Sequence, residues 1–327
     1  MSTVGIIFDQ VFGDSRSLSW ILQFWPVIIA AFGCSLAATW LCKKVALQLG
    51  IVDKPDNLVK THKEPVAYLG GVGIFVGIAA GGLAGIYGLV GEQYFATAFK
   101  WLLGILAGGG IACFVGVVDD IFDIKPVQKI GGQIIAAIAL IFAGILPDFT
   151  VFNEFFGWDL PQSINLILGA PFVVMVVLGA TNSLNLLDGL DGLCAGVTAI
   201  IGLAMLLLTV HLATWGWSDF GDPVRVIICL GLIGGVLGFL PFNKHPAKIF
   251  MGDAGSMLLG FTVAALFILF AHQHPRWLIA ALVVFGLPIL DTATALVRRA
   301  INKKPLFVSD RGHIYDQMID RGIPLKK

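Results

Sequence analysis

Residues 181–192 read Thr181-Asn-Ser-Leu-Asn-Leu-Leu-Asp-Gly-Leu-Asp-Gly192 and join two long apolar segments. Polar side chains recur at every third position of this stretch, at Asn182, Asn185, Asp188 and Asp191. A step of three residues falls only about 60° short of a full helical turn, so we expect these side chains to line one side of a helix. Such groups are unfavourable beside lipid unless they meet water, a metal or a ligand. Packing against polar groups of neighbouring helices is the simpler alternative.

The overall composition predicts a polytopic membrane protein. The chain has 327 residues, is 57% hydrophobic and only 13% charged, and has a mean hydropathy of +0.89. A soluble domain needs a more polar surface than this composition supplies. The formal net charge is zero, which gives no general attraction to nucleic acid. We therefore expect an all-α membrane helix bundle that forms a single domain over residues 1–327.

Nine apolar segments are long enough to cross a membrane as helices. An odd number of spans places the two ends of the chain on opposite sides of the membrane. The expected spans are residues 20–42, 69–90, 98–118, 130–147, 163–181, 193–213, 224–242, 256–272 and 277–299.

Basic residues are distributed unevenly between the two sets of loops. One set, which includes the tail after residue 298, holds 17 of the 21 Lys and Arg residues. Because basic residues are enriched in cytoplasmic loops, we expect this set and the C-terminus in the cytoplasm and the N-terminus outside. The unusual polar clusters fall in the same set, so we expect a cytoplasmic active site. Its loops would be 43–68, 119–130, 182–192, 243–255 and 300–320.

Three carboxylates lie at the end of one apolar segment, at Asp119, Asp120 and Asp123. Carboxylates this close repel one another unless a cation bridges them or one of them holds a proton. Oxygen ligands suit Mg²⁺ or Mn²⁺ and argue against zinc. Adjacent carboxylates also suit a general base, whereas a solvated acidic helix end is the simpler alternative.

The other polar loops carry residue types that bind phosphate and nucleotide. Lys60 and Lys63 precede a glycine-rich helix start, where they suit phosphate or, alternatively, anionic lipid headgroups. In the loop 243–255, Asp253 could ligate a metal and Phe250 could stack on a base. Oxygen ligands for Mg²⁺, phosphate-binding lysines and a membrane location together predict phosphoryl transfer with one lipid partner.

The order and spacing of these motifs resemble one known family. The motifs are Asp119-Asp120 with Asp123, the stretch Asn182-x-x-Asn185-Leu-Leu-Asp188-Gly-Leu-Asp191-Gly, and the stretch Phe242-Asn243-x-x-Pro-Ala-x-Ile-Phe250-Met-Gly-Asp253-Ala-Gly-Ser256. They resemble the polyprenyl-phosphate N-acetylhexosamine-1-phosphate transferases of the MraY/WecA type. The resemblance implies transfer of a sugar 1-phosphate from a UDP-N-acetylhexosamine to undecaprenyl phosphate, with release of UMP. It also implies Mg²⁺, with Mn²⁺ as a substitute, and a multi-pass protein of the bacterial inner membrane that could form a homodimer.

The resemblance also implies roles for individual residues. Asp253 would be the chief Mg²⁺ ligand, and Asp119 would deprotonate the lipid phosphate. Asp191, Asn243 and Phe250 would hold the uridine. The candidate catalytic residues are Asp119, Asp120, Asp188, Asp191 and His313; the candidate substrate-binding residues are Lys60, Lys63, Lys125, Lys129, Asn182, Asn243, Phe250 and Arg311; the candidate metal ligands are Asp253 and Asn185.

The tail departs from the family pattern. Family members usually carry His-x-His-His or a triple His, whereas this chain reads His313-Ile-Tyr315-Asp316. The motif bears on sugar recognition, so the identity of the sugar stays open. The other motifs look more like the UDP-N-acetylglucosamine branch, which starts cell-surface polysaccharides such as O-antigen or teichoic acid. The alternative is the peptidoglycan branch, which uses UDP-MurNAc-pentapeptide.

Two other functions stay open on the sequence alone. A cation-coupled or proton-coupled transporter would also carry acids in its spans, but near the bilayer midplane and often in repeated halves. Here the acids cluster at one face and no repeat is visible. Asp291 is the exception, because it lies well inside an expected span, and we expect it to support the site from beneath or to relay protons. A family member that binds polyprenyl phosphate without turnover is the third hypothesis.

Overall fold

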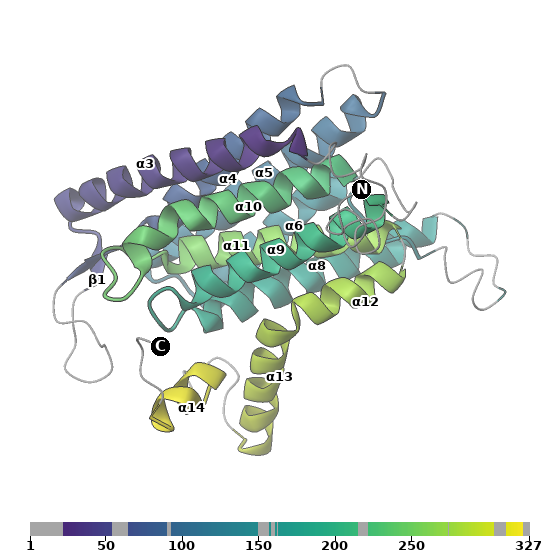
Figure 1. Cartoon of the computed structure of the whole chain (residues 1–327). Helices are drawn as coiled ribbons and strands as arrows, with labels where there is room; N and C mark the ends of the chain where they lie inside the picture. The colour runs from purple at the N-terminus through teal and green to yellow at the C-terminus, as the bar shows by residue number, and fades with distance from the viewer. Residues whose placement is uncertain are drawn as a thin grey trace, which may run out of the picture.

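The computed structural model is almost entirely helical in the residues that it describes (Figure 1). This confirms the expected all-α membrane bundle. The described residues are 22–53, 65–89, 93–149, 157, 161, 163–214, 222–273, 275–303 and 312–322.

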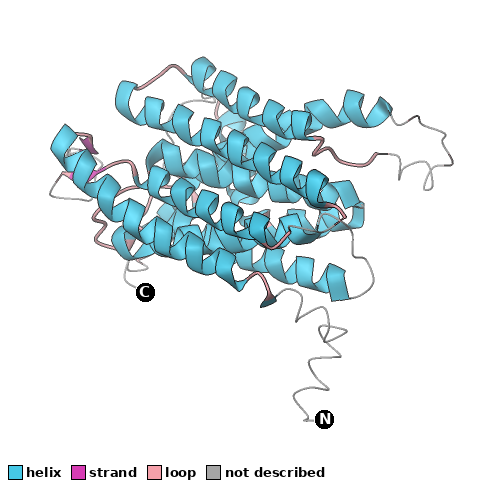
Figure 2. Cartoon of the chain, turned by 90° about the horizontal axis from the view of Figure 1, so that it is seen from above, coloured by secondary structure: helices cyan, strands magenta, loops and turns pink. Residues whose placement is uncertain are grey.

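Eight helices in the described part of the chain are long and apolar enough to cross a membrane. They lie side by side as a bundle (Figures 1 and 2). In chain order they are α3 (Trp25–Leu49), α4 (Gly70–Tyr87), α5 (Phe95–Phe122), α6 (Pro126–Ala143), α8 (Ser163–Leu187), α9 (Leu193–Thr214), α10 (Asp222–Asn243) and α11 (Gly252–Gln273).

The ninth expected span, residues 277–299, is interrupted by a bend, whereas the sequence predicts one helix there. It consists of α12 (Pro275–Val284) and α13 (Gly286–Ile301), which are bent by 71° at Phe285. Gly286 and Pro288 explain the break, because glycine lowers helix stability and proline removes a backbone hydrogen-bond donor. As a result α13 projects from the bundle, and the short tail helix α14 (Ile314–Asp320) lies near it (Figure 1).

Helix α11 forms the centre of the bundle. It is apolar on all sides, and its most apolar 18 residues are all buried. It packs against α4, α5 and α8. Close backbone approach requires glycine at two of these contacts, because a Cβ at Gly116 would overlap the backbone of Ala254 and one at Gly260 would overlap Thr181. These contacts hold the ends of α5 and α8 against the start of α11.

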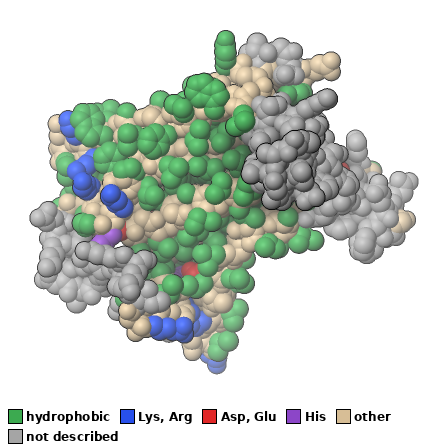
Figure 3. Space-filling view, viewed as in Figure 1, with side chains coloured by type: hydrophobic (Ala, Val, Ile, Leu, Met, Phe, Trp, Pro, Cys, Tyr) green, Lys and Arg blue, Asp and Glu red, His purple; other side chains and the backbone are tan. Residues whose placement is uncertain are grey.

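Large apolar side chains cover the outside of the bundle, as a lipid environment requires. Phe114, Phe142 and Ile200 are exposed on three different helices. Figure 3 shows apolar side chains over the middle of one face, with Lys and Arg side chains gathered at one end and on the projecting part below. The protein is therefore a multi-pass membrane protein.

A small sheet ties two loops together at one end of the bundle. Strand β1 (Val52–Asp53) pairs antiparallel with β2 (Val66–Ala67), and Ala67 forms a bridge with Ile249. The N–H of Phe250 also donates to the carbonyl of Ala67 at 2.8 Å. The first loop therefore lies beside the loop that carries Phe250 and Asp253.

Candidate active site

The start of α11 is capped by a carboxylate from the end of α5. Asp120 Oδ1 accepts the N–H of Asp253 at 2.8 Å, and its Oδ2 accepts the N–H of Ala254 at 3.1 Å. A carboxylate at this position satisfies free backbone donors and the positive end of the helix dipole. Gly252 has a φ of +67°, and a Cβ there would overlap the Asp120 carboxylate. Residues 252–256 form the first turn of α11, whereas the sequence predicts that this span begins at residue 256.

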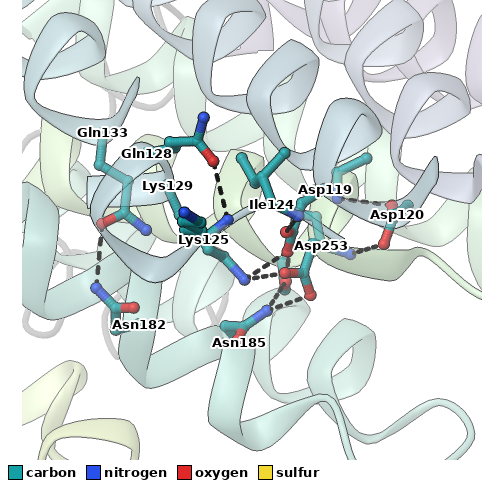
Figure 4. Close-up of polar contacts among 12 residues, drawn as sticks. Asp119, Asp120, Ile124, Lys125, Gln128, Lys129, Gln133, Asn182, Asn185 and Asp253 are labelled. Atoms are coloured by element: carbon teal, nitrogen blue, oxygen red, sulfur yellow. Dashed lines mark hydrogen bonds and ion pairs between the residues drawn. The ribbon is translucent and has the colours of Figure 1, made fainter. Parts of the chain in front are cut away.

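Lys129 of α6 lies between two carboxylates (Figure 4). Its Nζ is 2.9 Å from Asp119 Oδ2 and makes a close ion pair with Asp253 Oδ2. The other oxygen of Asp119 accepts the backbone N–H of Ile124 at 3.1 Å, which fixes the carboxylate at the end of α5. One ammonium group therefore marks the point where carboxylates from α5 and α11 converge.

Asn185 approaches the same carboxylate from α8. Its Nδ2 donates to Asp253 Oδ1 at 2.6 Å and to Ser256 Oγ at 3.0 Å. One turn earlier, Asn182 Nδ2 donates to Gln133 Oε1 at 3.2 Å and to its own helix at the Leu178 carbonyl. Asn185 thus joins α8 to α11, and Asn182, one helical turn earlier, joins α8 to α6.

The polar stripe of residues 182–191 is shorter than the sequence predicts. Helix α8 ends at Leu187, and residues 188–192 form a turn before α9. Asn182 and Asn185 are helical, but Asp188 and Asp191 lie in this turn, so the four side chains do not share one helical face. Gly189 and Gly192 explain the early end of the helix, and Gly192 adopts a φ of +76°.

The turn 188–192 is tied to the loop between α10 and α11. Asp191 Oδ2 lies 2.8 Å from His245 Nδ1 and accepts the N–H of Ala247 at 3.0 Å. Asn243 accepts the N–H of Gly192 at 3.0 Å and donates to the carbonyl of Ile249 at 3.0 Å. Asn243 is only 2% exposed. It joins two loops in this structure, and its contact with uridine stays a prediction.

Asp188 adds a further carboxyl group to the cluster. Loss of solvation raises its pKa to about 8, and the negative charges of Asp253, Asp120 and Asp191 act in the same direction. Among the described residues, Lys129 is the lysine that pairs with these carboxylates, and the acidic groups of the cluster outnumber it. A bound cation would relieve this excess of negative charge.

Residues 102–271 match the family model described as glycosyl transferase family 4. The chain belongs to this family. It is 34% identical to the probable undecaprenyl-phosphate N-acetylglucosaminyl 1-phosphate transferase of Bacillus subtilis (strain 168), over 90% of this chain and 78% of that protein. These findings confirm the family that the motifs indicated.

Two further relatives align along most of the chain. The decaprenyl-phosphate N-acetylglucosaminephosphotransferase of Mycobacterium tuberculosis (strain ATCC 25618 / H37Rv) is 30% identical over 87% of this chain and 73% of its own length. The undecaprenyl-phosphate alpha-N-acetylglucosaminyl 1-phosphate transferase of Escherichia coli (strain K12) is 28% identical over 90% of this chain and 76% of its own length.

The tail lies outside the segment that matches the family 4 model, yet the structure brings it to the acid cluster. His313 Nδ1 is 2.8 Å from Asp291 Oδ2, and the ring of His313 stacks on Tyr315 with 5.7 Å between centroids. The tip of Tyr315 lies against Gly189, in the turn that carries Asp188. The tail, the turn and the α10–α11 loop therefore meet at one end of this family member.

The remaining predicted site residues lie farther from the cluster or outside the described residues. Lys125 is exposed at the start of α6, where its backbone N–H donates to Gln128 Oε1 at 3.0 Å. Phe250 packs its ring 6.0 Å from that of Tyr68. Lys60, Lys63 and Arg311 lie outside the described residues.

Sequence reasoning missed Tyr68 and Gln133. Burial raises the pKa of the Tyr68 hydroxyl, and the negative charges of Asp53, Asp120 and Asp253 act in the same direction. Gln133 is fully buried within α6. A lone tyrosine in a loop and a lone glutamine in an apolar helix carry no spacing signal, although Gln133 lies one helical turn after Lys129.

Proposed function

We propose that the protein transfers N-acetylglucosamine 1-phosphate from UDP-N-acetylglucosamine to undecaprenyl phosphate and releases UMP. The relatives from B. subtilis and E. coli are named for this sugar phosphate and this lipid, and the M. tuberculosis relative is named for the same sugar. The observation that carries the proposal is the convergence of carboxylates on Lys129, in a chain that aligns with these enzymes over about nine-tenths of its length. The reaction would be the first membrane step of cell-surface polysaccharide synthesis.

The donor set fits Mg²⁺. In the described part of the chain, no group of three or more His, Cys, Asp or Glu side chains forms a metal site by itself. Mg²⁺ usually takes only one or two protein carboxylates and completes its shell with water and substrate phosphates. Asp253 would hold the ion, with Asp119 beside it and the amide oxygen of Asn185 available, because the Asn185 nitrogen donates to Asp253. When bound, the ion would neutralise the diphosphate and the departing UMP.

The chemistry requires an attack by the lipid phosphate on the phosphorus that carries the sugar. An oxygen of the lipid phosphate forms the new P–O bond, and the bond from that phosphorus to UMP breaks. Asp119 would accept the proton of the lipid phosphate, because its carboxylate lies at the end of α5 beside Lys129. Lys129 would move from the two carboxylates to a phosphate oxygen once the charge of the diphosphate is present.

An apolar cavity near Asn182 suits the lipid chain. It has a volume of about 540 Å³, is open to the outside, and lies between α6 and α8 with only apolar residues in its lining. One of them, Leu178, lies one helical turn from Asn182 and accepts its amide hydrogen bond at 2.7 Å. The polyprenyl chain would lie along this cavity, with its phosphate past Asn182 and toward Lys129. The lining residues are Ile141, Ala170, Pro171, Val174, Met175 and Leu178.

We place the reaction on the cytoplasmic face of the inner membrane. The described parts of the five polar loops expected on the cytoplasmic side meet at one end of the bundle through the contacts of Ala67, Asp120, Asn243 and Tyr315. These loops also belong to the set that holds most of the basic residues, as cytoplasmic loops do. A UDP-sugar made in the cytoplasm would reach the site directly from water.

The test is UMP release by purified protein with Mg²⁺, undecaprenyl phosphate and a panel of UDP-sugars. The panel contains UDP-N-acetylglucosamine, UDP-N-acetylgalactosamine, UDP-glucose and UDP-MurNAc-pentapeptide. We expect UMP release with UDP-N-acetylglucosamine that depends on both Mg²⁺ and the lipid. Release only with UDP-MurNAc-pentapeptide would move the protein to the peptidoglycan branch. Absence of release with every donor, in protein shown to be folded, would contradict the proposed function.

A further inference from the structure

Asp291 is a buried acid outside the cluster described above. It lies in α13, after the bend, and is 2% exposed. Both of its oxygens are used by the tail, because Oδ2 pairs with His313 Nδ1 at 2.8 Å and Oδ1 accepts the N–H of Ile314 at 2.8 Å. A buried carboxylate is stable only when such partners satisfy it. Asp291 therefore holds both the imidazole and the first residue of α14.

The contacts continue from His313 to the acid cluster. His313 is 4% exposed, and its ring is stacked on that of Tyr315 at an interplanar angle of 7°. The hydroxyl end of Tyr315 lies against Gly189, where a Cβ would overlap it. Asp188 precedes Gly189 in the same turn. A continuous series of contacts thus runs from Asp291 through His313 and Tyr315 to the Asp188 turn.

A second contact fixes the tail to α13. Arg298 Nη1 donates to the carbonyl of Gly312 at 2.9 Å, one residue before His313. Arg298 and Asp291 are seven residues apart on α13, so two turns of this helix hold the start of α14. The tail is therefore positioned by α13, the helix that the bend turns away from the bundle.

We propose that Asp291 is a positioning residue that holds His313 and, through it, Tyr315 on the Asp188 turn, and so sets the orientation of the tail that the family resemblance links to sugar recognition. This inference rests on the proposed function. Because Nδ1 faces Asp291, the Nε2 atom of His313 is the ring nitrogen left for a ligand. The tail is a specificity element whose orientation depends on one carboxylate buried in α13.

The position of the tail favours contact with the nucleotide-sugar donor rather than with the lipid acceptor. Tyr315 contacts the turn that follows α8, beyond the membrane-spanning part of that helix. The apolar cavity, in contrast, lies between α6 and α8 inside the span. A water-soluble donor would meet the tail, whereas the lipid chain would approach from the cavity. Displacement of the tail should therefore raise the KM for UDP-N-acetylglucosamine and leave the KM for undecaprenyl phosphate unchanged.

The experiment is a double-mutant cycle with Asp291→Asn, His313→Ala and the double variant of the full chain. UMP release is measured while each substrate is varied in turn. We expect Asp291→Asn to raise the donor KM about tenfold in the wild-type background and less than about twofold in the His313→Ala background, because the two residues share one network. Asp320→Asn, an exposed acid at the end of α14, is the matched control and should leave both KM values unchanged.

A merely structural role for Asp291 gives a different result. Fewer folded molecules would lower the apparent kcat and leave both KM values unchanged. That result, or an equal effect of Asp291→Asn in both backgrounds, would overturn the inference. If wild-type protein releases no UMP with any donor, the proposed function fails; if wild-type protein turns over and the donor KM of Asp291→Asn does not move, only this inference fails.

Gly189→Ala provides an independent test that leaves Asp291 intact. The added Cβ would displace the tip of Tyr315 from the turn. We expect a donor KM increase of severalfold, on the order of that for Asp291→Asn, and no further increase when Gly189→Ala is added to Tyr315→Ala. An increase of the same size in the Tyr315→Ala background would show that the alanine acts on the turn itself and would contradict the proposed contact.

Discussion

Two ionic clusters lie near opposite ends of α10, and they differ in balance. At the first turn of α10, Arg225 Nη2 is 2.5 Å from Asp222 Oδ1, both side chains are at most 1% exposed, and Arg225 Nη1 donates to the Leu269 carbonyl at 3.0 Å. At the other end, Asn243 holds the turn of the acid cluster, where one ammonium, that of Lys129, serves two carboxylates. The 22 residues of α10 separate the clusters by about 33 Å.

The net charge of a buried cluster distinguishes structural charges from functional ones. Asp222 and Arg225 cancel each other's charge, so this buried ion pair stabilises the fold and needs no further ion to neutralise it. A cluster with several acids and one base is incomplete, because its negative charge exceeds its positive charge. The second arrangement is stable in a membrane protein only if water, a bound proton, a cation or a charged substrate offsets the excess negative charge.

The largest expected effect follows from replacing Asp253, the acid of the second cluster that contacts both Lys129 and Asn185. Asp253→Asn keeps the size of the side chain and loses the charge that faces Lys129. We expect the rate of UMP release to fall by about 10³-fold or more, because both charge stabilisation and cation binding are lost. Thermal unfolding in detergent should show no loss of stability. A variant with more than about a tenth of wild-type activity would contradict a functional role for the unbalanced cluster.

Asp222→Asn tests the balanced cluster. The change leaves the Arg225 guanidinium buried beside a neutral group, which should cost about 3–5 kcal/mol of stability. The melting temperature should fall by several degrees, while each folded molecule keeps its rate of UMP release. Replacement of both residues, Asp222→Leu with Arg225→Met, should recover most of the lost stability. A folded Asp222→Asn protein without activity would show that this pair also serves the site.

The pKa of Asp188 predicts how stability changes with pH. Its carboxyl has a folded-state pKa raised to about 8 from a usual value of 3.8, so the folded state binds the proton more tightly than the unfolded state. The contribution of Asp188 to stability is therefore full below about pH 4, falls as pH rises and is lost above about pH 8. The melting temperature of the metal-free protein, relative to that of Asp188→Asn, should fall over this window. A constant difference between the two proteins would contradict the raised pKa.

The smallest expected effect concerns the lipid side of the site. Ala170→Phe would fill part of the apolar cavity between α6 and α8. We expect the KM for undecaprenyl phosphate to rise about fivefold, with no change in the KM for the donor, because a poorly fitting apolar contact that costs about 1 kcal/mol changes affinity roughly fivefold. Leu203→Phe, an exposed position on α9, is the control. Equal acceptor KM values for both variants would show that the lipid takes another path.

The sequence predicted the spans and the acids well because both depend on local patterns. Long apolar runs mark helices in lipid, and Asp119, Asp120 and Asp253 stand out against them. The bend at Phe285 was missed because apolarity continues through it. The contact between Asp291 and His313 was not predicted because the two residues are 22 positions apart, one in α13 and the other just before α14, and no local spacing pattern connects them. The contact of Gln133 with Asn182 was not predicted because the two residues lie on different helices, and only the packing of α6 against α8 brings them together.

The most direct test of the contrast is the shift in melting temperature caused by Mg²⁺ together with UDP-N-acetylglucosamine. Wild-type protein and Asp222→Asn should gain the same stabilisation, about 2.7 kcal/mol at ligand concentrations near 100 times Kd, even though their starting stabilities differ. Asp253→Asn should gain little or none. An equal shift in Asp253→Asn and wild-type protein, or loss of the shift in folded Asp222→Asn, would contradict the claim that the unbalanced cluster is the cation-dependent donor site.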